Sequence, residues 1–410
     1  MGNLIIENAR VVTPVGKEAV KGTKMGTLTE IPNATIVITD GIITFIGNKE
    51  DMPALTDIKN YKTFDAKGNV ALPGFVDSHT HLIFGGFRPD EFEWRLKGDT
   101  YMSIMERGGG IQSTVNATKE ASPEHLVKKA EWFLNQMSNM GVTTVEVKSG
   151  YGLDFDTELK MLDVIESLKN SEAGRIEIVS TFLGAHAVPP EFKGRTSEFV
   201  DLLIEWLPKL KNKARFCDVF CEKNVFEIED SRRLLKAARE NGYKLKLHAD
   251  EIVTLGGSEL SAELKAVSAD HLLHVSDEGV RRMAEEGVVA TLLPLTAFAL
   301  KEPFAPARKF IDAGAAVALA TDLNPGSCFS GSIPLTIALA CIYMNMSIEE
   351  TITALTLNGA AALDMADETG SLEVGKKGDV AILGSDNYRV LPYYVGMNCV
   401  QTTIFRGTVL

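Results

Sequence analysis

Leu72-Pro73-Gly74-Phe75-Val76-Asp77-Ser78-His79-Thr80-His81 is the stretch of sequence that decides the fold. Its apolar part predicts a buried strand, which leads directly into a His-x-His pair. Residues two apart on a strand lie on the same face, so the imidazoles of His79 and His81 can converge on one ion. The stretch therefore predicts a metal site at the carboxyl end of a strand.

Apolar runs of the same kind recur along the middle of the chain. Amphipathic stretches such as 124–140 and 156–170 predict helices, and short apolar runs between such stretches predict parallel strands. The predicted strands are 72–77, 142–147, 176–182, 216–221, 245–248, 269–272, 288–293 and 317–321. Eight β/α units in series predict an α/β fold, a closed (β/α)₈ TIM barrel, in which active-site residues lie where strands end.

Short β-branched runs at both ends of the chain predict a second, smaller domain. They lie at 4–6, 11–13, 35–38 and 42–46, with Asp40-Gly41 as a hairpin turn, and they return at 380–383 and 402–405. We expect residues 1–70 and 360–410 to form one composite β-sandwich, with the barrel of residues 71–359 inserted into it.

Composition excludes several classes of partner. The net charge of −13 argues against nucleic acid and against anionic membrane surfaces. The longest apolar stretch, 333–344, is shorter than the roughly 18 residues of a membrane span. The N-terminus lacks the features of a signal peptide, and the 5 scattered cysteines contain no CxxC pair. We therefore expect a cytoplasmic protein that binds neither nucleic acid nor membrane.

Polar clusters close four more of the predicted strands, at 184–186, 248–251, 270–271 and 321–322. The predicted metal ligands are His79, His81, His248 and Asp322. Three neutral imidazoles and one carboxylate suit one zinc or ferrous ion and leave a position open for water. Such an ion activates water near neutral pH. A lone His-x-His is usually solvated or hydrogen-bonded, so the prediction depends on the complete set.

Glu251 and His271 are the predicted proton-transfer residues, with Asp322 as a further candidate. Glu251 follows His248 by three residues, so a helical turn would direct its carboxylate toward the ion, where it could carry a proton to a leaving nitrogen. His271 could polarise the substrate carbonyl or help to deprotonate water. The alternatives are a carboxylate at a helix start and a packed histidine. His274 has the weaker claim.

These motifs resemble those of the amidohydrolase superfamily. Residues 72–81 are similar to its first-strand motif, and Gly375-Lys376-Lys377-Gly378-Asp379-Val380 is similar to its C-terminal signature. The resemblance implies the barrel, the composite β-sandwich and a single metal. Residues 220–223 do not match the carboxylated lysine that many binuclear members use, although Glu222 or Lys148 could still supply a second ligand set.

Longer motifs at 84–88, 108–111, 146–152 and 322–327 are similar to those of cyclic amidohydrolases of histidine degradation. This resemblance implies ring opening of 4-imidazolone-5-propanoate to N-formimino-L-glutamate by a homodimer. It also implies which residues contact small molecules: Arg88, Tyr151, His186, Glu251 and Ser327 for the substrate, and Asn324 and Gly326 for the product.

A carboxylate on the substrate agrees with the assignment of Arg88 to substrate binding, because its guanidinium can pair bidentately with a propanoate tail. Tyr151, and with a weaker claim Tyr101, could donate a hydroxyl to the same tail. Taken alone, Arg88 would be a surface residue, the tyrosines would be packing residues, and 324–327 would be a turn. Gly108-Gly109-Gly110, in the long first crossover, is expected to be a flexible lid.

Two other functions stay open at this point. A deaminase of a purine, pyrimidine or related heterocycle would share the His, Glu and Asp set, but its substrate lacks a carboxylate, so Arg88 discriminates between the two. A non-catalytic scaffold descended from this fold would have little reason to keep all the ligands and both proton-transfer candidates.

Overall fold

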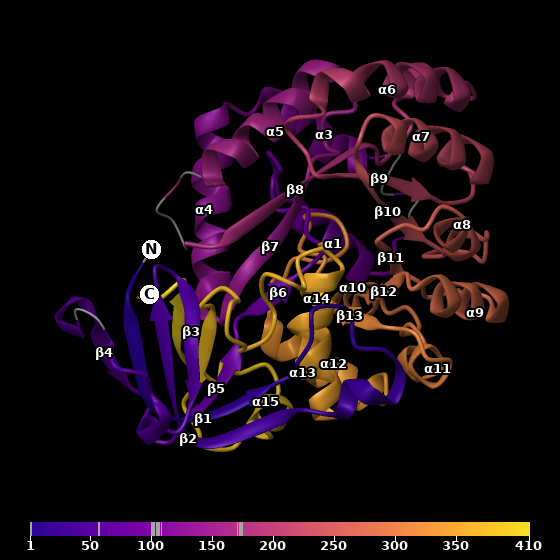
Figure 1. Cartoon of the computed structure of the whole chain (residues 1–410). Coiled ribbons are helices and arrows are strands. Elements are labelled where there is room, and N and C mark those ends of the chain that lie inside the picture. Colours follow the sequence, from indigo (N-terminus) through magenta and orange to yellow (C-terminus); the bar gives the residue numbers. More distant parts are fainter. Residues whose placement is uncertain are drawn as a thin grey trace.

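The computed structural model describes residues 2–55, 58–99, 103, 107, 109–169, 171 and 175–410 (Figure 1). The strands are β1 (Leu4–Thr13), β2 (Thr29–Thr39), β3 (Ile42–Gly47), β4 (Lys62–Asp65), β5 (Val70–Pro73), β6 (Phe75–Asp77), β7 (Val142–Lys148), β8 (Glu177–Ala185), β9 (Phe216–Cys221), β10 (Lys244–Ala249), β11 (Ser268–His271), β12 (Val289–Leu292), β13 (Val317–Leu319), β14 (Val380–Leu383), β15 (Val400–Phe405) and β16 (Thr408–Val409).

The α-helices are α1 (Pro89–Leu96), α3 (Ile111–Glu120), α4 (Pro123–Asn139), α5 (Phe155–Lys169), α6 (Thr196–Leu210), α7 (Ile228–Glu240), α8 (Gly257–Glu263), α9 (Asp277–Glu286), α10 (Pro294–Leu300), α11 (Ala307–Asp312), α12 (Ile333–Tyr343), α13 (Ile348–Leu355), α14 (Leu357–Ala361) and α15 (Val390–Tyr393). Short 3₁₀ helices lie at η1 (Gly22–Gly26), η2 (Lys49–Asp51), η3 (Ile58–Asn60) and η4 (Pro190–Phe192).

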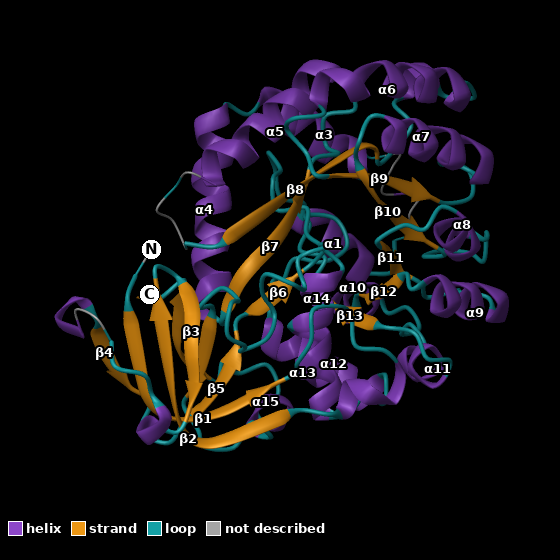
Figure 2. Ribbon diagram, viewed as in Figure 1, coloured by secondary structure: helices purple, strands orange, loops and turns teal. Residues whose placement is uncertain are grey.

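The middle of the chain forms the predicted barrel. Its 8 strands are parallel and follow the order β13-β12-β11-β10-β9-β8-β7-β6, and Figure 2 shows helices on the outside of this ring. The strands are buried because the helices cover one face and the filled interior covers the other. The predicted (β/α)₈ TIM barrel with a second sheet from both termini is therefore confirmed.

The predicted first strand, 72–77, is divided between two sheets. Leu72 and Pro73 belong to β5, which pairs with β14 outside the barrel, and the barrel strand β6 starts only at Phe75. Gly74 lies at the break, where a Cβ would overlap the side chain of Thr143 on β7. Glycine thus permits the close approach at which the chain passes from one sheet to the other.

The barrel closes where its first and last strands end. The Asp77 carboxylate accepts hydrogen bonds from the Thr321 backbone amide, at 3.0 Å, and from the Thr321 hydroxyl, at 2.6 Å. The Asp322 amide donates to the His79 carbonyl, at 2.9 Å, and the His81 amide to the Leu323 carbonyl, at 2.8 Å. The segments that carry the predicted metal ligands are thereby joined side by side.

The second sheet combines the two ends of the chain. Its order is β16-β15-β14-β5-β1-β2-β3, with β4 paired to β1, and the Gly2 amide donates to the Arg406 carbonyl at 3.0 Å. The predicted Asp40-Gly41 turn has positive φ at both residues, 50° and 82°, which suits a two-residue hairpin. The domain boundaries near residues 70 and 360 stay a prediction. Among the described residues, no helix combines the length and the apolar character that a membrane span requires.

Candidate active site

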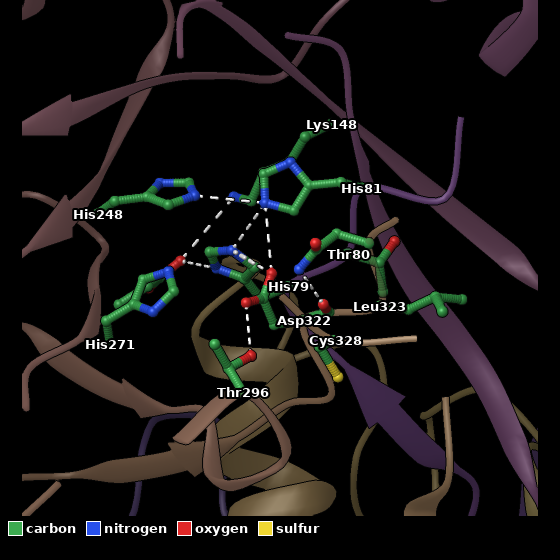
Figure 3. A network of polar contacts seen from close by, with 12 residues as sticks. His79, Thr80, His81, Lys148, His248, His271, Thr296, Asp322, Leu323 and Cys328 are labelled. Atoms are coloured by element: carbon green, nitrogen blue, oxygen red, sulfur yellow. Dashed lines mark hydrogen bonds and ion pairs between the residues drawn. The ribbon is translucent and has the colours of Figure 1, made fainter. Parts of the chain in front are cut away.

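The four predicted metal ligands lie together at the carboxyl ends of the barrel strands (Figure 3). His79 Nε2 lies 3.2 Å from His81 Nε2, which lies 3.3 Å from His248 Nε2. Asp322 Oδ1 lies 3.5 Å from His79 Nε2 and 3.4 Å from His81 Nε2. The possible ligand atoms thus form two groups that share His79: one of His79, His81 and His248, and one of His79, His271 and Asp322.

Two buried carboxylates orient the histidines. Asp270 Oδ2 lies 2.6 Å from His79 Nδ1, and Asp218 Oδ2 lies 3.1 Å from His248 Nδ1. The Asp270 carboxylate accepts the Nδ1 proton of His79, which leaves the lone pair of that imidazole on Nε2, the atom that faces the centre; Asp218 lies within ion-pair distance of His248 Nδ1. The His79 ring is therefore oriented with Nε2 available as a ligand atom.

The donor set fits a divalent ion. Asp322 Oδ2 accepts a hydrogen bond from the Thr296 hydroxyl at 2.6 Å, but the buried Oδ1 has no hydrogen-bond donor among the described residues. Burial, followed by neighbouring positive charges, lowers the pKa of His79 and holds its imidazole neutral, as ligation requires. A buried, unsatisfied carboxylate oxygen 3.5 Å from the neutral imidazole of His79 fits a cation at this place.

A buried charge network of Glu146, Lys148, Asp218, Lys246 and Asp270 lies beneath this centre. Lys148 Nζ lies 2.8 Å from a Glu146 carboxylate oxygen and 2.7 Å from Asp218 Oδ2, and Lys246 Nζ lies 3.5 Å from Asp270 Oδ2. The pKa of Lys148 is raised, because the Asp218 and Glu146 charges outweigh burial, so this ammonium is not an available ligand. Asp218 and Asp270 of this network are also the carboxylates that lie beside His248 and His79.

Glu251 and His271 adjoin the centre. Glu251 Oε1 lies 3.5 Å from His271 Nδ1. Burial first, and then the charge of Asp322, raises the pKa of Glu251 to about 8. Burial, and then the charge of His248, lowers the pKa of His271 well below its usual range. At neutral pH the pair therefore combines a carboxyl that can hold a proton with a neutral imidazole.

The backbone brings Glu251 to this place without the expected helical turn. Residues 251–253 form a bend, and Asp250 before them has φ +49°, in the left-handed region. The Asp250 carboxylate accepts hydrogen bonds from the amides of residues 255–258, which folds the loop back on itself. A side chain that captures amides in this way competes with helix formation. Asp322 and His271 also have positive φ, 55° and 76°.

Arg88 lies against the predicted product-binding turn. Its Nε donates to the Pro325 carbonyl at 3.4 Å, and a Cβ on Gly326 would overlap its guanidinium. The Asn324 side chain builds the turn, since its Oδ1 accepts the amides of Gly326 and Ser327 at 2.8 Å each. The structure therefore brings Arg88 and the whole 324–327 turn together.

Tyr151 and His186 are close to His81. The His186 ring stacks on that of His81, with 4.9 Å between centroids and 16° between planes, and the Tyr151 ring lies 5.1 Å from that of His186. His186 Nδ1 donates to the Gly150 carbonyl at 3.0 Å, which leaves Nε2 unprotonated in the neutral ring. Tyr101, the remaining predicted contact, lies outside the described residues, as does Gly108.

Sequence reasoning missed the carboxylates that orient the histidines. Asp218 and Asp270 stand in apolar strands, and the available signal was their charge at positions that face the barrel interior. Glu222, considered as a second-metal ligand, instead accepts backbone amides, among them that of Ile252.

Solved structures share the fold at low sequence identity. A triazine hydrolase variant has a TM-score of 0.74 at 19% identity and covers 100% of this chain and 95% of its own. A 5-methylcytosine deaminase from Klebsiella pneumoniae has a TM-score of 0.71 at 18% identity, with 99% and 97% covered. These likenesses support the fold alone.

Closer relatives match over the full length. An imidazolonepropionase from Bacteroides thetaiotaomicron is 65% identical and covers 99% of this chain and 98% of its own. An imidazolonepropionase from Clostridium tetani is 54% identical, with 100% and 98% covered. The amidohydrolase family model matches residues 70–410. The chain therefore belongs to the amidohydrolase family and, within it, to the imidazolonepropionases.

Proposed function

We propose that this chain hydrolyses 4-imidazolone-5-propanoate to N-formimino-L-glutamate, a ring-opening step of histidine degradation. The observation that carries the proposal is the 65% identity, over 99% of the chain, to an imidazolonepropionase. The His and Asp centre with its adjacent proton-transfer pair supplies chemistry that such a hydrolysis needs.

The proposed ligands of one zinc or ferrous ion per subunit are His79, His81, His248 and Asp322. When bound, the ion supplies Lewis acidity, which activates water and polarises the ring carbonyl. Asp270 keeps the ligand nitrogen of His79 unprotonated and fixed in direction, and Asp218 lies 3.1 Å from His248 Nδ1, on the side of that ring away from the centre.

Glu251 is proposed to move the protons. Its pKa of about 8 is close to neutral pH, so the carboxyl can both accept a proton and deliver it. It takes a proton from the attacking water, together with Asp322, and gives one to the ring nitrogen as the C–N bond breaks. His271, neutral and with both ring nitrogens free of hydrogen bonds to described residues, can donate an N–H to the developing oxyanion.

Arg88 is proposed to bind the propanoate tail. Its guanidinium is partly buried beside the 324–327 turn, where a bidentate pair with a carboxylate is shielded from water. Tyr151, His186 and Ser327 are proposed as further substrate contacts, with Asn324 and Gly326 on the product. Tyr101 stays a prediction from sequence, as do the homodimer and the cytoplasmic location.

The deaminase alternative is not favoured, because the relatives named imidazolonepropionase are 54–65% identical and the deaminases of known structure are 15–19% identical. The test is hydrolysis of 4-imidazolone-5-propanoate, generated in place by urocanase and followed by loss of its ultraviolet absorbance. We expect loss of absorbance that a chelator abolishes and that Zn²⁺ or Fe²⁺ restores. Ammonia release from guanine or cytosine by a metal-loaded enzyme that leaves the imidazolone intact would reverse the assignment.

A further inference from the structure

Glu222 is a buried carboxylate whose partners are backbone amides. It follows β9 and is 1% exposed. Its Oε2 accepts the Ile252 amide at 2.8 Å and the Val253 amide at 3.4 Å, and its Oε1 accepts the Lys223 amide at 2.7 Å. Within the described part of the chain, no Lys, Arg or His forms an ion pair with it. Burying a carboxylate without a cationic partner is costly, and the hydrogen bonds from the three amides offset that cost.

The amides that it holds belong to the segment that carries Glu251. Ile252 directly follows Glu251, and its side chain is 60% exposed, so apolar packing does not fix this position. The other end of the segment is tied by Asp250, which binds the amides of residues 255–258. Glu251 therefore lies between two carboxylate anchors, one from β9 and one from the end of β10.

We propose that Glu222 is a positioning residue for catalysis, which holds the 251–253 bend so that the Glu251 carboxylate reaches the reaction centre. The inference rests on the proposed function, because it assigns Glu251 to proton transfer. A general acid or base must lie within hydrogen-bond reach of the group it serves, and a displacement of about 1 Å can cost about 10²-fold in rate. Loss of the Ile252 anchor would permit a displacement of that kind.

The variants are Glu222→Ala, which removes both acceptor oxygens, and Glu222→Gln, which keeps one. We expect kcat to fall about 10²-fold in the first and about 10-fold in the second, with KM and metal content within about twofold of wild type. Glu227→Gln is the matched control, since that exposed carboxylate accepts an amide on the same loop, from Asn224 at 3.4 Å, and is expected to leave kcat unchanged.

Amide hydrogen exchange measures whether Glu222 holds the 251–253 bend, and it does so without the substrate. In Glu222→Ala, peptides that contain Ile252 and Val253 are expected to exchange faster, while peptides of β10 keep wild-type protection. Unchanged exchange in this segment, or an unchanged kcat, would overturn the inference, and loss of bound metal would instead place Glu222 in the metal site. If wild type fails to open the imidazolone, the proposed function fails, but the exchange result still decides whether Glu222 holds the bend.

Discussion

The active site depends on single atoms placed by residues far apart in sequence. Sequence predicted the ligands His79, His81, His248 and Asp322, and the structure brings them together, because each follows or ends an apolar strand in a barrel whose strand ends meet. It did not predict that Asp218 and Asp270 would orient the imidazoles. Asp218 and His248 lie on the neighbouring strands β9 and β10, whereas Asp270 on β11 reaches His79 from across the ring. Which of these side chains meet inside the barrel depends on the three-dimensional fold, and one-dimensional patterns do not contain it.

Glu251→Gln tests proton transfer at this scale. The amide keeps the size of the side chain but neither accepts nor delivers a proton, so we expect kcat to fall by about 10²- to 10⁴-fold. Metal content by atomic emission is expected to equal that of wild type, since Glu251 is not a proposed ligand. Turnover at the wild-type rate would remove Glu251 from the mechanism.

Arg88→Met tests recognition of the substrate tail. Methionine fills similar space without the charge, so we expect KM to rise about 10²-fold, with a smaller change in kcat, when a charge-assisted bidentate pair is lost. Arg88→Lys is expected to recover only part of the lost substrate binding, because an ammonium cannot reproduce the planar, two-pronged geometry of a guanidinium. An unaltered KM in Arg88→Met would show that the tail binds elsewhere.

At the scale of strands and loops, the apolar periodicity predicted which strands exist, and their order along the chain, better than it predicted where each strand begins and ends. The predicted strand 380–383 matches β14, whereas the run 72–77 is divided by the close passage of Gly74 over Thr143. The residues that flank this break, Leu72-Pro73 and Phe75-Val76, are all apolar, so only the sheet partners reveal it. In the same way, the amide-binding carboxylate of Asp250 replaces the helical turn expected at Glu251.

Lys148→Met tests how much the buried ion pairs of strands β7 and β9 stabilise the fold. Removing this ammonium leaves Glu146 and Asp218 without their nearest cation, and breaking a buried pair in this way costs about 3–5 kcal/mol. Urea unfolding followed by circular dichroism measures the free energy of unfolding. Lys223→Met, on the exposed loop after β9, is the control and is expected to change it by less than about 0.5 kcal/mol. A loss below about 1 kcal/mol in Lys148→Met would contradict the paired network.

At the scale of the whole molecule, the recurrence of β-branched runs at both ends predicted that the termini share a sheet. The join between them uses Asp379, which belongs to the C-terminal signature. Its carboxylate accepts the Arg406 amide at 3.0 Å and the Thr369 hydroxyl at 3.3 Å, and its carbonyl accepts the Gly74 amide at 2.9 Å. One residue thus ties the last strands to the entry of the barrel.

Asp379 also makes stability depend on pH. Burial raises its pKa to about 6 from an ordinary value of 3.8, so the folded state binds the proton more tightly than the unfolded state. The resulting stabilisation is fully present below about pH 4 and is lost as the pH rises to about 6; its full size is on the order of 3 kcal/mol. We expect the difference in Tm between wild type and Asp379→Asn to change across this window and to be constant above about pH 7. A difference independent of pH from 4 to 7 would refute this expectation.

The charge network beneath the proposed metal site bears on the charge of the ion that the site would bind. Two ammonium groups, of Lys148 and Lys246, face four carboxylates, of Glu146, Asp218, Asp270 and Asp322. With all six ionised, this part of the barrel interior has an excess of two negative charges, which a medium of low polarity tolerates poorly. A doubly charged cation would bring this part of the interior to neutrality, whereas a singly or triply charged cation would leave a net charge. We therefore expect the proposed site to prefer a doubly charged ion over a singly or triply charged one.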